Sequence, residues 1–269
     1  MIYRLLGALS RYIIAIENLG FIPTIELIKS RVFPNKKNSE KIFRTKKFGD
    51  IHWRTKGDWV ISHLYTPQIE IYSPSDNISV NTIFDLGANI GIETLRFNKM
   101  YNHAFVVAVE AESKNYQQLL KNTESHKNIT AVHAAIWNKE ANLKIESSSE
   151  NNQTFCVREV ENGDIHYHII GKSLMSIMSE HGVEEIDVLK IDIEGAESVL
   201  FDKSCDAWIG FVKCFVIECP DSDEPFTMQK IFHSLIRNKI NVNTYVNGEN
   251  IVMVRDDLDW KPKNILHYQ

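Results

Sequence analysis

The chain has 269 residues, of which 43% are hydrophobic, so it can bury a large core in one or two domains. Its formal net charge is −5 and no basic patch stands out, so its charge gives no support for nucleic-acid binding. The cysteines have neither C-x-x-C spacing nor paired histidines, and we expect them to be reduced, buried thiols in a cytoplasmic protein. They are Cys156, Cys205, Cys214 and Cys219.

The first 31 residues mix apolar and charged side chains. Arg4, Arg11 and Glu17 interrupt the apolar stretch, so no transmembrane segment is predicted, and the run Leu5–Leu9 is too short for a signal peptide. Helical periodicity instead predicts two amphipathic helices that meet near 20–23. We expect them to pack on the rest of the protein or on a partner such as a second copy of the chain, with peripheral membrane contact as the alternative.

A polar, lysine-rich stretch over 34–47 is predicted to be a connector. The chain therefore divides into an N-terminal helical extension and linker, residues 1–47, and a main domain, residues 48–269. Residues 50–54 are expected to form a strand, and Asp58 is expected to cap a short helix over 58–65. We interpret Arg54 and Asp58 as a local ion pair, and the alternative is that they line the entrance for a substrate.

The most informative stretch is Asp85–Gly91, directly behind the apolar run Thr82–Phe84. It predicts a buried strand that ends at a tight glycine turn and restarts as a helix, so that backbone N–H groups meet a nucleotide-like ligand. A dinucleotide site needs G-x-G-x-x-G around a pyrophosphate, but here Asn89 replaces the middle glycine and Asp85 opens the turn. A carboxylate there repels phosphate and favours a ligand with ammonium and sulfonium groups, such as S-adenosylmethionine.

A second apolar strand is predicted over Ala104–Val109, and it ends in Glu110, 23 residues beyond Gly87. An acidic side chain at the end of the neighbouring strand can accept hydrogen bonds from both hydroxyls of a ribose. The alternative is a solvated acid. A helix follows, and the third strand is expected over 129–135.

Beyond the third strand, strands and helices alternate in the way that predicts a doubly wound α/β sheet, apart from one insertion of short strands at its edge. The closing hairpin would make the last strand antiparallel. The elements predicted here are inserted strands at 141–145, 154–157 and 165–170, a helix capped by Ser173, strands at 186–191 and 211–217, a helix with Met228, Ile231 and Leu235 inward, and hairpin strands at 242–246 and 251–254.

The ends of the predicted strands carry residues that can bind ligands. In a doubly wound sheet, the ligand crevice lies beyond the carboxyl ends of the strands, so these residues are expected at one rim. The strand ends are Gly87, Glu110, Ala134, Asp192 and Glu218.

Three blocks of sequence resemble the FkbM-type family of S-adenosylmethionine-dependent methyltransferases: Asp85–Gly91, Val109–Glu110 and, most specifically, Leu189–Glu197. The similarity covers about 54–255. It implies a class I methyltransferase fold, Rossmann-like and doubly wound, with a mostly parallel seven-stranded sheet and an antiparallel last strand. It also implies methyl transfer to oxygen, often the hydroxyl of a sugar or natural product.

The resemblance also assigns roles to individual residues. The methionine part of the cofactor is expected to be held by Asp85, Gly87, Asn89 and Gly91. Glu110 is expected to hold the ribose, and Ala135 to lie near the adenine. Trp137 is expected either near the adenine or in the core.

Two positions depart from the family pattern. Ala111 stands where relatives usually have a proline, which should leave adenosine binding intact. The segment Lys172–Met175 replaces a Thr-Leu-Asp segment of the family. This second departure leaves the identity of the acceptor open.

The chemistry that the resemblance implies needs an acceptor aligned with the methyl carbon and a group that takes its proton. Asp192 is our first candidate for acceptor or cofactor contact and for the base, followed by Glu194 and Glu218; the alternative for Asp192 is hydrogen bonding to loop amides. Glu197 is expected in the first turn of a helix, where its negative charge interacts favourably with the helix dipole. No metal is predicted, although Asp221 could join these acids as an oxygen ligand.

The sequence therefore predicts a cytoplasmic S-adenosylmethionine-dependent O-methyltransferase. The acceptor is expected to be a small molecule or glycan, with the hydroxyl on a sugar, a polysaccharide precursor or a related metabolite. The alternative is a non-catalytic binding or assembly module that retains the fold. An NAD-dependent oxidoreductase is disfavoured because Asp85 and Asn89 do not suit a pyrophosphate cradle.

Overall fold

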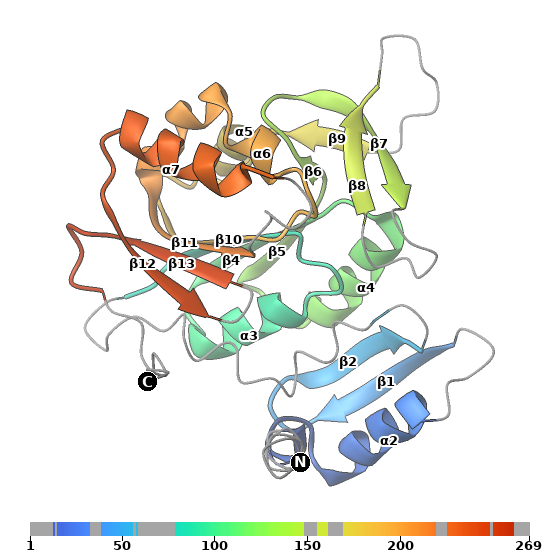
Figure 1. Ribbon diagram of the computed structural model, residues 1–269. Coiled ribbons are helices and arrows are strands. Elements are labelled where there is room, and N and C mark those ends of the chain that lie inside the picture. The colour runs from blue at the N-terminus through green and yellow to red at the C-terminus, as the bar shows by residue number, and fades with distance from the viewer. Residues whose placement is uncertain are drawn as a thin grey trace.

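A computed structural model of the chain describes residues 13, 15–32, 39–55, 58, 79–147, 155–160, 169–218, 225–247 and 250–260. A seven-stranded sheet with helices on both faces forms the main body, and a smaller sheet and an N-terminal unit flank it (Figure 1). Within these ranges, no helix has the length and apolar character needed to cross a bilayer.

The large sheet has the strand order β12-β13-β11-β10-β3-β4-β5. Five neighbouring strands run parallel, whereas β13 pairs antiparallel with both β11 and β12. This confirms the class I methyltransferase sheet with an antiparallel last strand. The strands are β3 (Thr82–Leu86), β4 (Phe105–Glu110), β5 (Ile129–His133), β10 (Ile186–Ile191), β11 (Val212–Glu218), β12 (Val242–Asn247) and β13 (Asn250–Arg255).

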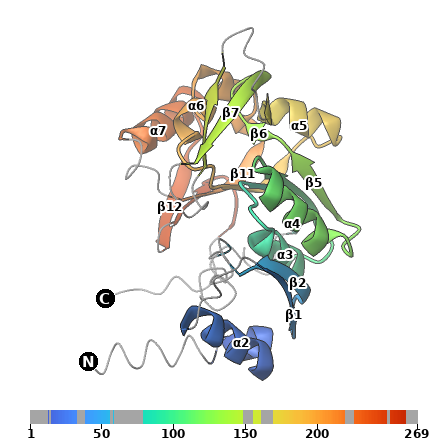
Figure 2. The same ribbon diagram turned by 90° about the vertical axis from the view of Figure 1, so that its right-hand side faces the viewer.

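Helices cover both faces of this sheet because its central strands are apolar on both sides (Figures 1 and 2). Along β3, Ile83 packs toward the α3 side, while Phe84 and Leu86 pack toward the α5 and α7 side. The helices are α3 (Ile92–Met100) and α4 (Ser113–Thr123) on one face, and α5 (Leu174–Glu180), α6 (Glu197–Leu200) and α7 (Thr227–Arg237) on the other.

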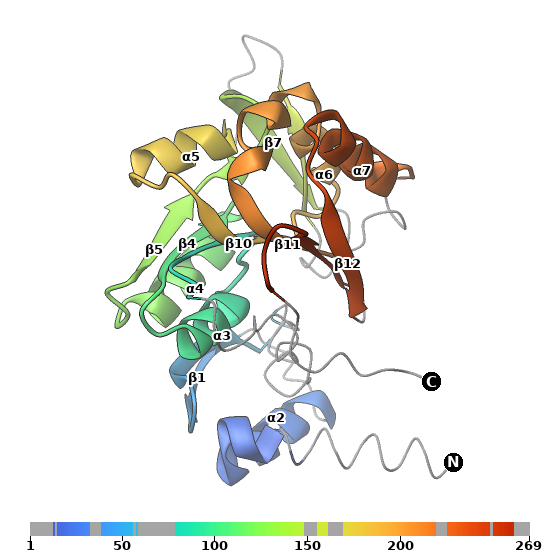
Figure 3. The ribbon, with the colours of Figure 1, turned by 90° about the vertical axis from the view of Figure 1, so that its left-hand side faces the viewer.

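The N-terminal unit packs on the α3 side of the molecule (Figures 1 and 3). The described part of the first helix meets α2 (Phe21–Val32) at Gly20, as predicted. Strands β1 (Glu40–Thr45) and β2 (Gly49–Arg54) form an antiparallel hairpin. A core cluster joins this unit to α3 and consists of Ala15, Leu19, Phe43, Ile51, Trp53, Ile90, Ile92 and Leu95.

Strand β1 lies inside the segment that the sequence predicted as a connector. Phe43 alone of its six residues is buried, so the polar neighbours hide the strand pattern. The proposed division at residues 47 and 48 falls in the turn of the hairpin and stays a prediction. The predicted helix at 58–65 lies outside the described residues except for Asp58.

A second, four-stranded sheet has the order β6-β9-β7-β8 and confirms the predicted β insertion. The third predicted strand, 129–135, is wrong at its end, because β5 stops at His133 and Ala135 already belongs to the second sheet. Periodicity alone cannot show this break, since Ala134–Ile136 stays apolar and buried on both sides of it. The strands are β6 (Ala135–Ile136), β7 (Ala141–Ser147), β8 (Phe155–Glu159) and β9 (Ile169–Lys172).

Two of the predicted thiols can be compared with the structure. Cys205 and Cys214 are free and buried, as expected. The side chains of Cys156 and Cys219 lie outside the described part of the chain.

Candidate functional site

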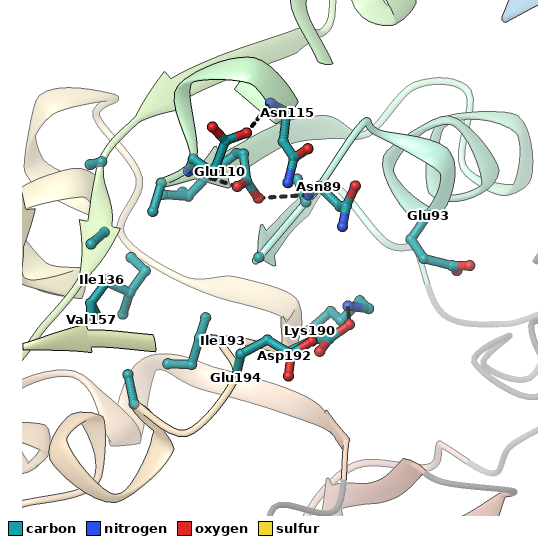
Figure 4. A pocket seen from close by; sticks show the side chains of 18 residues that line it. Asn89, Glu93, Glu110, Asn115, Ile136, Val157, Lys190, Asp192, Ile193 and Glu194 are labelled. Atoms are coloured by element: carbon teal, nitrogen blue, oxygen red, sulfur yellow. Dashed lines mark hydrogen bonds and ion pairs between the residues drawn. The ribbon is translucent and has the colours of Figure 1, made fainter. Parts of the chain in front are cut away.

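A pocket opens at the carboxyl ends of β3, β4 and β10 (Figure 4). In the sheet, β4 and β5 follow on one side of β3, and the later strands β10 and β11 follow on the other, so the strand order changes direction at this point. One wall carries polar groups from the β3 and β4 ends, and the opposite wall carries the charged end of β10. The lining residues of most interest are Gly87, Asn89, Glu110, Asn115, Lys190, Asp192 and Glu194.

The glycine turn brings the ends of β3 and β10 together. Gly87 has a φ of +81°, and a Cβ atom there would lie only 1.7 Å from the backbone oxygen of Asp192. The Asp192 backbone N–H donates to the oxygen of Leu86 at 3.0 Å. Only glycine satisfies both the positive φ and this close approach.

Glu110 is held mainly by backbone donors. Its two carboxylate oxygens accept from the N–H groups of Asn89 and Glu112, each at 2.8 Å; Figure 4 shows the bond to Asn89. The Asn115 side chain also hydrogen-bonds to it. Burial raises the pKa of Glu110 to about 7, and these hydrogen bonds oppose the shift. Because a carboxylate offers about four lone-pair positions and three are used here, Glu110 keeps acceptor capacity for about one hydroxyl group of a ligand.

The N-terminal hairpin reaches this wall of the pocket through Arg54. Its guanidinium pairs with the buried carboxylate of Asp58, with Nε 2.9 Å from Oδ1, which confirms the predicted local ion pair. The same guanidinium donates to the side-chain oxygen of Asn115, the residue that hydrogen-bonds to Glu110. A chain of contacts therefore runs from Asp58 through Arg54 and Asn115 to Glu110.

A second link joins β2 to the glycine turn. The side-chain oxygen of Asn122 accepts from the His52 backbone N–H at 2.6 Å, and its amide donates to the Ile90 oxygen at 2.7 Å. Asn122 is buried, so these bonds are shielded from water. The hairpin therefore belongs to the framework that positions the glycine turn.

The opposite wall carries charged side chains around Lys190. Its Nζ lies 2.9 Å from Asp192 Oδ2 and 3.8 Å from Asp85 Oδ1. Burial lowers the pKa of Lys190, but the charges of Asp192 and Asp85 outweigh burial and raise it above its ordinary value. Lys190 therefore stays an ammonium between the ends of β3 and β10.

Glu218 lies beside Asp192 at the end of β11. Burial and then the Asp192 charge raise the pKa of Glu218 to about 8, with Glu194 adding to the repulsion. These are the three acids that the sequence proposed as catalytic candidates, and the fold brings them together. Within the described part of the site, the positive charge of the Lys190 ammonium partly balances the negative charges of these acids.

Glu197 shapes the loop that follows Asp192. It lies in the first turn of α6, as predicted, and its carboxylate accepts from the N–H groups of Ile193 and Gly195 at 3.1 and 2.9 Å. Within this loop Glu194 has a φ of +53°, a conformation that costs a non-glycine residue about 1–3 kcal/mol. The bonds from Glu197 offset part of that strain.

An apolar wall completes the pocket between the two sheets. It consists of Ala134, Ala135, Ile136 and Val157. Trp137 does not line it; its ring is buried with Leu143 and Ile169, which supports the core role.

Two of the residues expected around the methionine part do not line the pocket. Asp85 is fully buried below it and accepts a 2.6 Å hydrogen bond from Thr94, while Gly91 precedes α3. Their proposed roles stay predictions. Within the described ranges, no three His, Cys, Asp or Glu side chains are arranged so that they could hold a metal ion, and Asp221 lies outside these ranges.

Sequence reasoning gave no role to Asn115 or Lys190, which both line the pocket. Lys190 was visible as a charge inside an otherwise apolar strand, which is a recognisable signal because an unpaired buried lysine is costly. Asn115 gave no such signal, since an asparagine early in a helix is ordinary.

The family model described as methyltransferase FkbM domain matches residues 85–244. The solved structure of a methyltransferase FkbM from Methylobacillus flagellatus KT is 13% identical with a TM-score of 0.48, and the match covers 73% of this chain and 55% of that one. The chain thus spans about half the length of that protein. A fibrillarin from Aeropyrum pernix with bound S-adenosyl-L-methionine is 11% identical with a TM-score of 0.41, covering 83% and 85% of the two chains. The search of curated proteins found no match.

Proposed function

Because the chain belongs to the FkbM methyltransferase family, we propose that it binds S-adenosylmethionine in this pocket and methylates a hydroxyl group of a sugar, a polysaccharide precursor or a related metabolite. The observation that carries the proposal is a single pocket with Glu110 on one wall and Asp192 on the other. The first suits a ribose and the second suits a reacting hydroxyl. We therefore expect one wall to bind the cofactor and the other to contact the acceptor.

The residues present fit the chemistry of the proposed cofactor. S-adenosylmethionine supplies an electrophilic methyl group on a sulfonium ion. Glu110 keeps a lone pair for a ribose hydroxyl, the apolar wall around Ala135 and Ile136 suits a purine, and the acids near Asp192 favour a positive charge.

The acids of the β10 and β11 ends supply the proton acceptor that an alcohol requires. The Lys190 ammonium lies 2.9 Å from Asp192 Oδ2 and helps to fix the position of this carboxylate. Glu218 and Glu194 stand next to Asp192 and can receive or pass on a proton. General-base assistance of this kind contributes about 10²–10⁴-fold to a rate.

The first experiment is isothermal titration calorimetry of the full chain with S-adenosylmethionine and S-adenosylhomocysteine. We expect both to bind, and an Asp85→Ala or Glu110→Ala variant to bind far more weakly. Absence of binding to the folded, intact protein would refute the proposal.

The second experiment identifies the acceptor. Mass spectrometry of glycans and metabolites from cells with and without the protein should reveal a species that differs by one methyl group. If the cofactor binds but no methylated product forms over a broad acceptor screen, the protein is a binding or assembly module instead of an enzyme.

A further inference from the structure

The net charge of −5 conceals an uneven distribution along the chain. Residues 1–58 contain 12 Lys and Arg against 5 Asp and Glu, whereas residues 59–269 contain 18 against 30. The N-terminal unit is therefore basic and the rest of the protein acidic. Such separated charges orient a protein in an external field.

The junction of the N-terminal helices also exposes large apolar side chains. Ile16 is 40% exposed, Phe21 65% and Ile22 71%. Ala15 and Leu19 are buried in the core cluster with Phe43, so the junction has one face toward the protein and one toward solvent. We call Ile16, Phe21 and Ile22 the junction patch.

Two lysines are held at the helix junction through their backbones. The backbone N–H groups of Lys46 and Lys47 donate to the oxygens of Leu19 and Asn18 at 3.3 and 3.1 Å, which holds the β1–β2 turn against the junction. Both lysines are exposed. The hairpin and α2 lie side by side in all three overall views (Figures 1, 2 and 3).

From this arrangement we propose that the N-terminal unit docks on an anionic lipid bilayer surface, with the junction patch in the acyl and headgroup boundary and Lys46 and Lys47 against the headgroups. Exposed apolar side chains flanked by lysines suit a lipid interface, because apolar burial and attraction to anionic lipid then add. The acidic remainder of the molecule is repelled by the same surface, so it faces away.

The charges argue against other occupants of the patch. Two copies of a unit that carries 12 basic and 5 acidic residues repel each other. Lysine is also depleted in protein–protein interfaces relative to the rest of protein surfaces. The proposal does not depend on methyl transfer.

Vesicle flotation with the full-length chain tests the proposal. We expect the protein to float with phosphatidylcholine vesicles that contain phosphatidylglycerol, to stay behind with phosphatidylcholine alone, and to lose binding as salt rises. The double variant Phe21→Ser, Ile22→Ser should bind at least about tenfold more weakly. The double variant Lys46→Glu, Lys47→Glu should also lose binding.

A matched control removes two exposed apolar side chains elsewhere. Ile236 is 71% exposed and Val246 74%, so Ile236→Ser, Val246→Ser should float like the parent protein. Thermal unfolding of each variant checks that it folds. No flotation of the parent, equal flotation of the junction-patch variant and the parent, or dimerisation that Phe21→Ser, Ile22→Ser abolishes would each overturn the proposal.

Discussion

The two walls of the pocket hold their carboxylates in different ways. On the β3–β4 wall, Glu110 accepts from backbone N–H groups of two loops, so its position follows from the chain path. On the opposite wall, which we call the β10–β11 wall after the strand ends that form it, Asp192 lines the pocket and Glu218 beside it does not. The two carboxyl groups repel each other, and the ammonium of Lys190 lies 2.9 Å from Asp192. The first wall therefore fixes its carboxylate through the backbone, whereas the second sets two acids against each other beside one cation, and we propose that the first binds the cofactor and the second holds the proton acceptor.

The largest effect is expected where the two walls meet. Gly87→Ala places a Cβ 1.7 Å from the Asp192 backbone oxygen and should lower the free energy of unfolding by more than about 3 kcal/mol. Gly182→Ala is the control, because Gly182 also has a positive φ but no heavy atom lies within 4 Å of the Cβ position. Equal losses in urea unfolding would show that φ, and not the contact, dominates.

Asp192→Asn tests the β10–β11 wall. It should lower kcat by about 100-fold or more, because the proton acceptor is lost, while the dissociation constant for S-adenosylmethionine changes by less than about tenfold. The measurement is S-adenosylhomocysteine formation with the acceptor found by mass spectrometry. A variant that binds poorly but turns over normally would reverse the roles of the two walls.

Glu110→Gln tests the β3–β4 wall. Loss of the charged acceptor should weaken S-adenosylmethionine binding by about 10–100-fold. Since the pKa of Glu110 is raised to about 7, the affinity of the parent protein for S-adenosylmethionine should rise as pH increases through that value. The affinity of Glu110→Gln should not change over the same range. Calorimetry on both sides of pH 7 measures this. A pH-independent parent would contradict the assignment.

Arg54→Lys tests whether the N-terminal hairpin supports Glu110. Lysine cannot bridge Asp58 and Asn115 with a planar fork, so binding of S-adenosylmethionine should weaken by about 3–10-fold. A double-mutant cycle with Glu110→Gln should show non-additive losses. Arg44→Lys is the control, because its side chain is 88% exposed. Additive losses would mean that Arg54 and Glu110 are not energetically coupled through Asn115.

The smallest effect concerns how the free energy of unfolding changes with pH. The Glu218 carboxyl ionises near pH 4.5 when unfolded, but its pKa is about 8 in the folded protein. Between these values the folded state binds more protons, so this group makes stability fall as pH rises. Glu218→Gln should flatten that fall in urea titrations. An unchanged slope would show that the pKa of Glu218 is not raised in the folded protein.

Much of the fold was predictable from the sequence, because central strands are apolar runs and their polar ends reach one rim. Asp85–Gly91 and Glu110 were recognisable for this reason, and β13 followed from the hairpin pattern. Contacts between distant segments were not. The partnership of Arg54 with Asn115 joins positions 61 residues apart, and the path of the chain after His133 depends on which sheet offers a partner to Ala135.

The cluster that joins Phe43, Ile51 and Trp53 to α3 has a consequence for protein engineering. A fragment that begins at residue 48 keeps β2 but loses its partner β1, and it uncovers Ile92 and Leu95 on α3. Such a fragment would expose the unpaired edge of a β-strand and an apolar surface, and both favour aggregation. Truncation and fusion designs should therefore start upstream of Ala15.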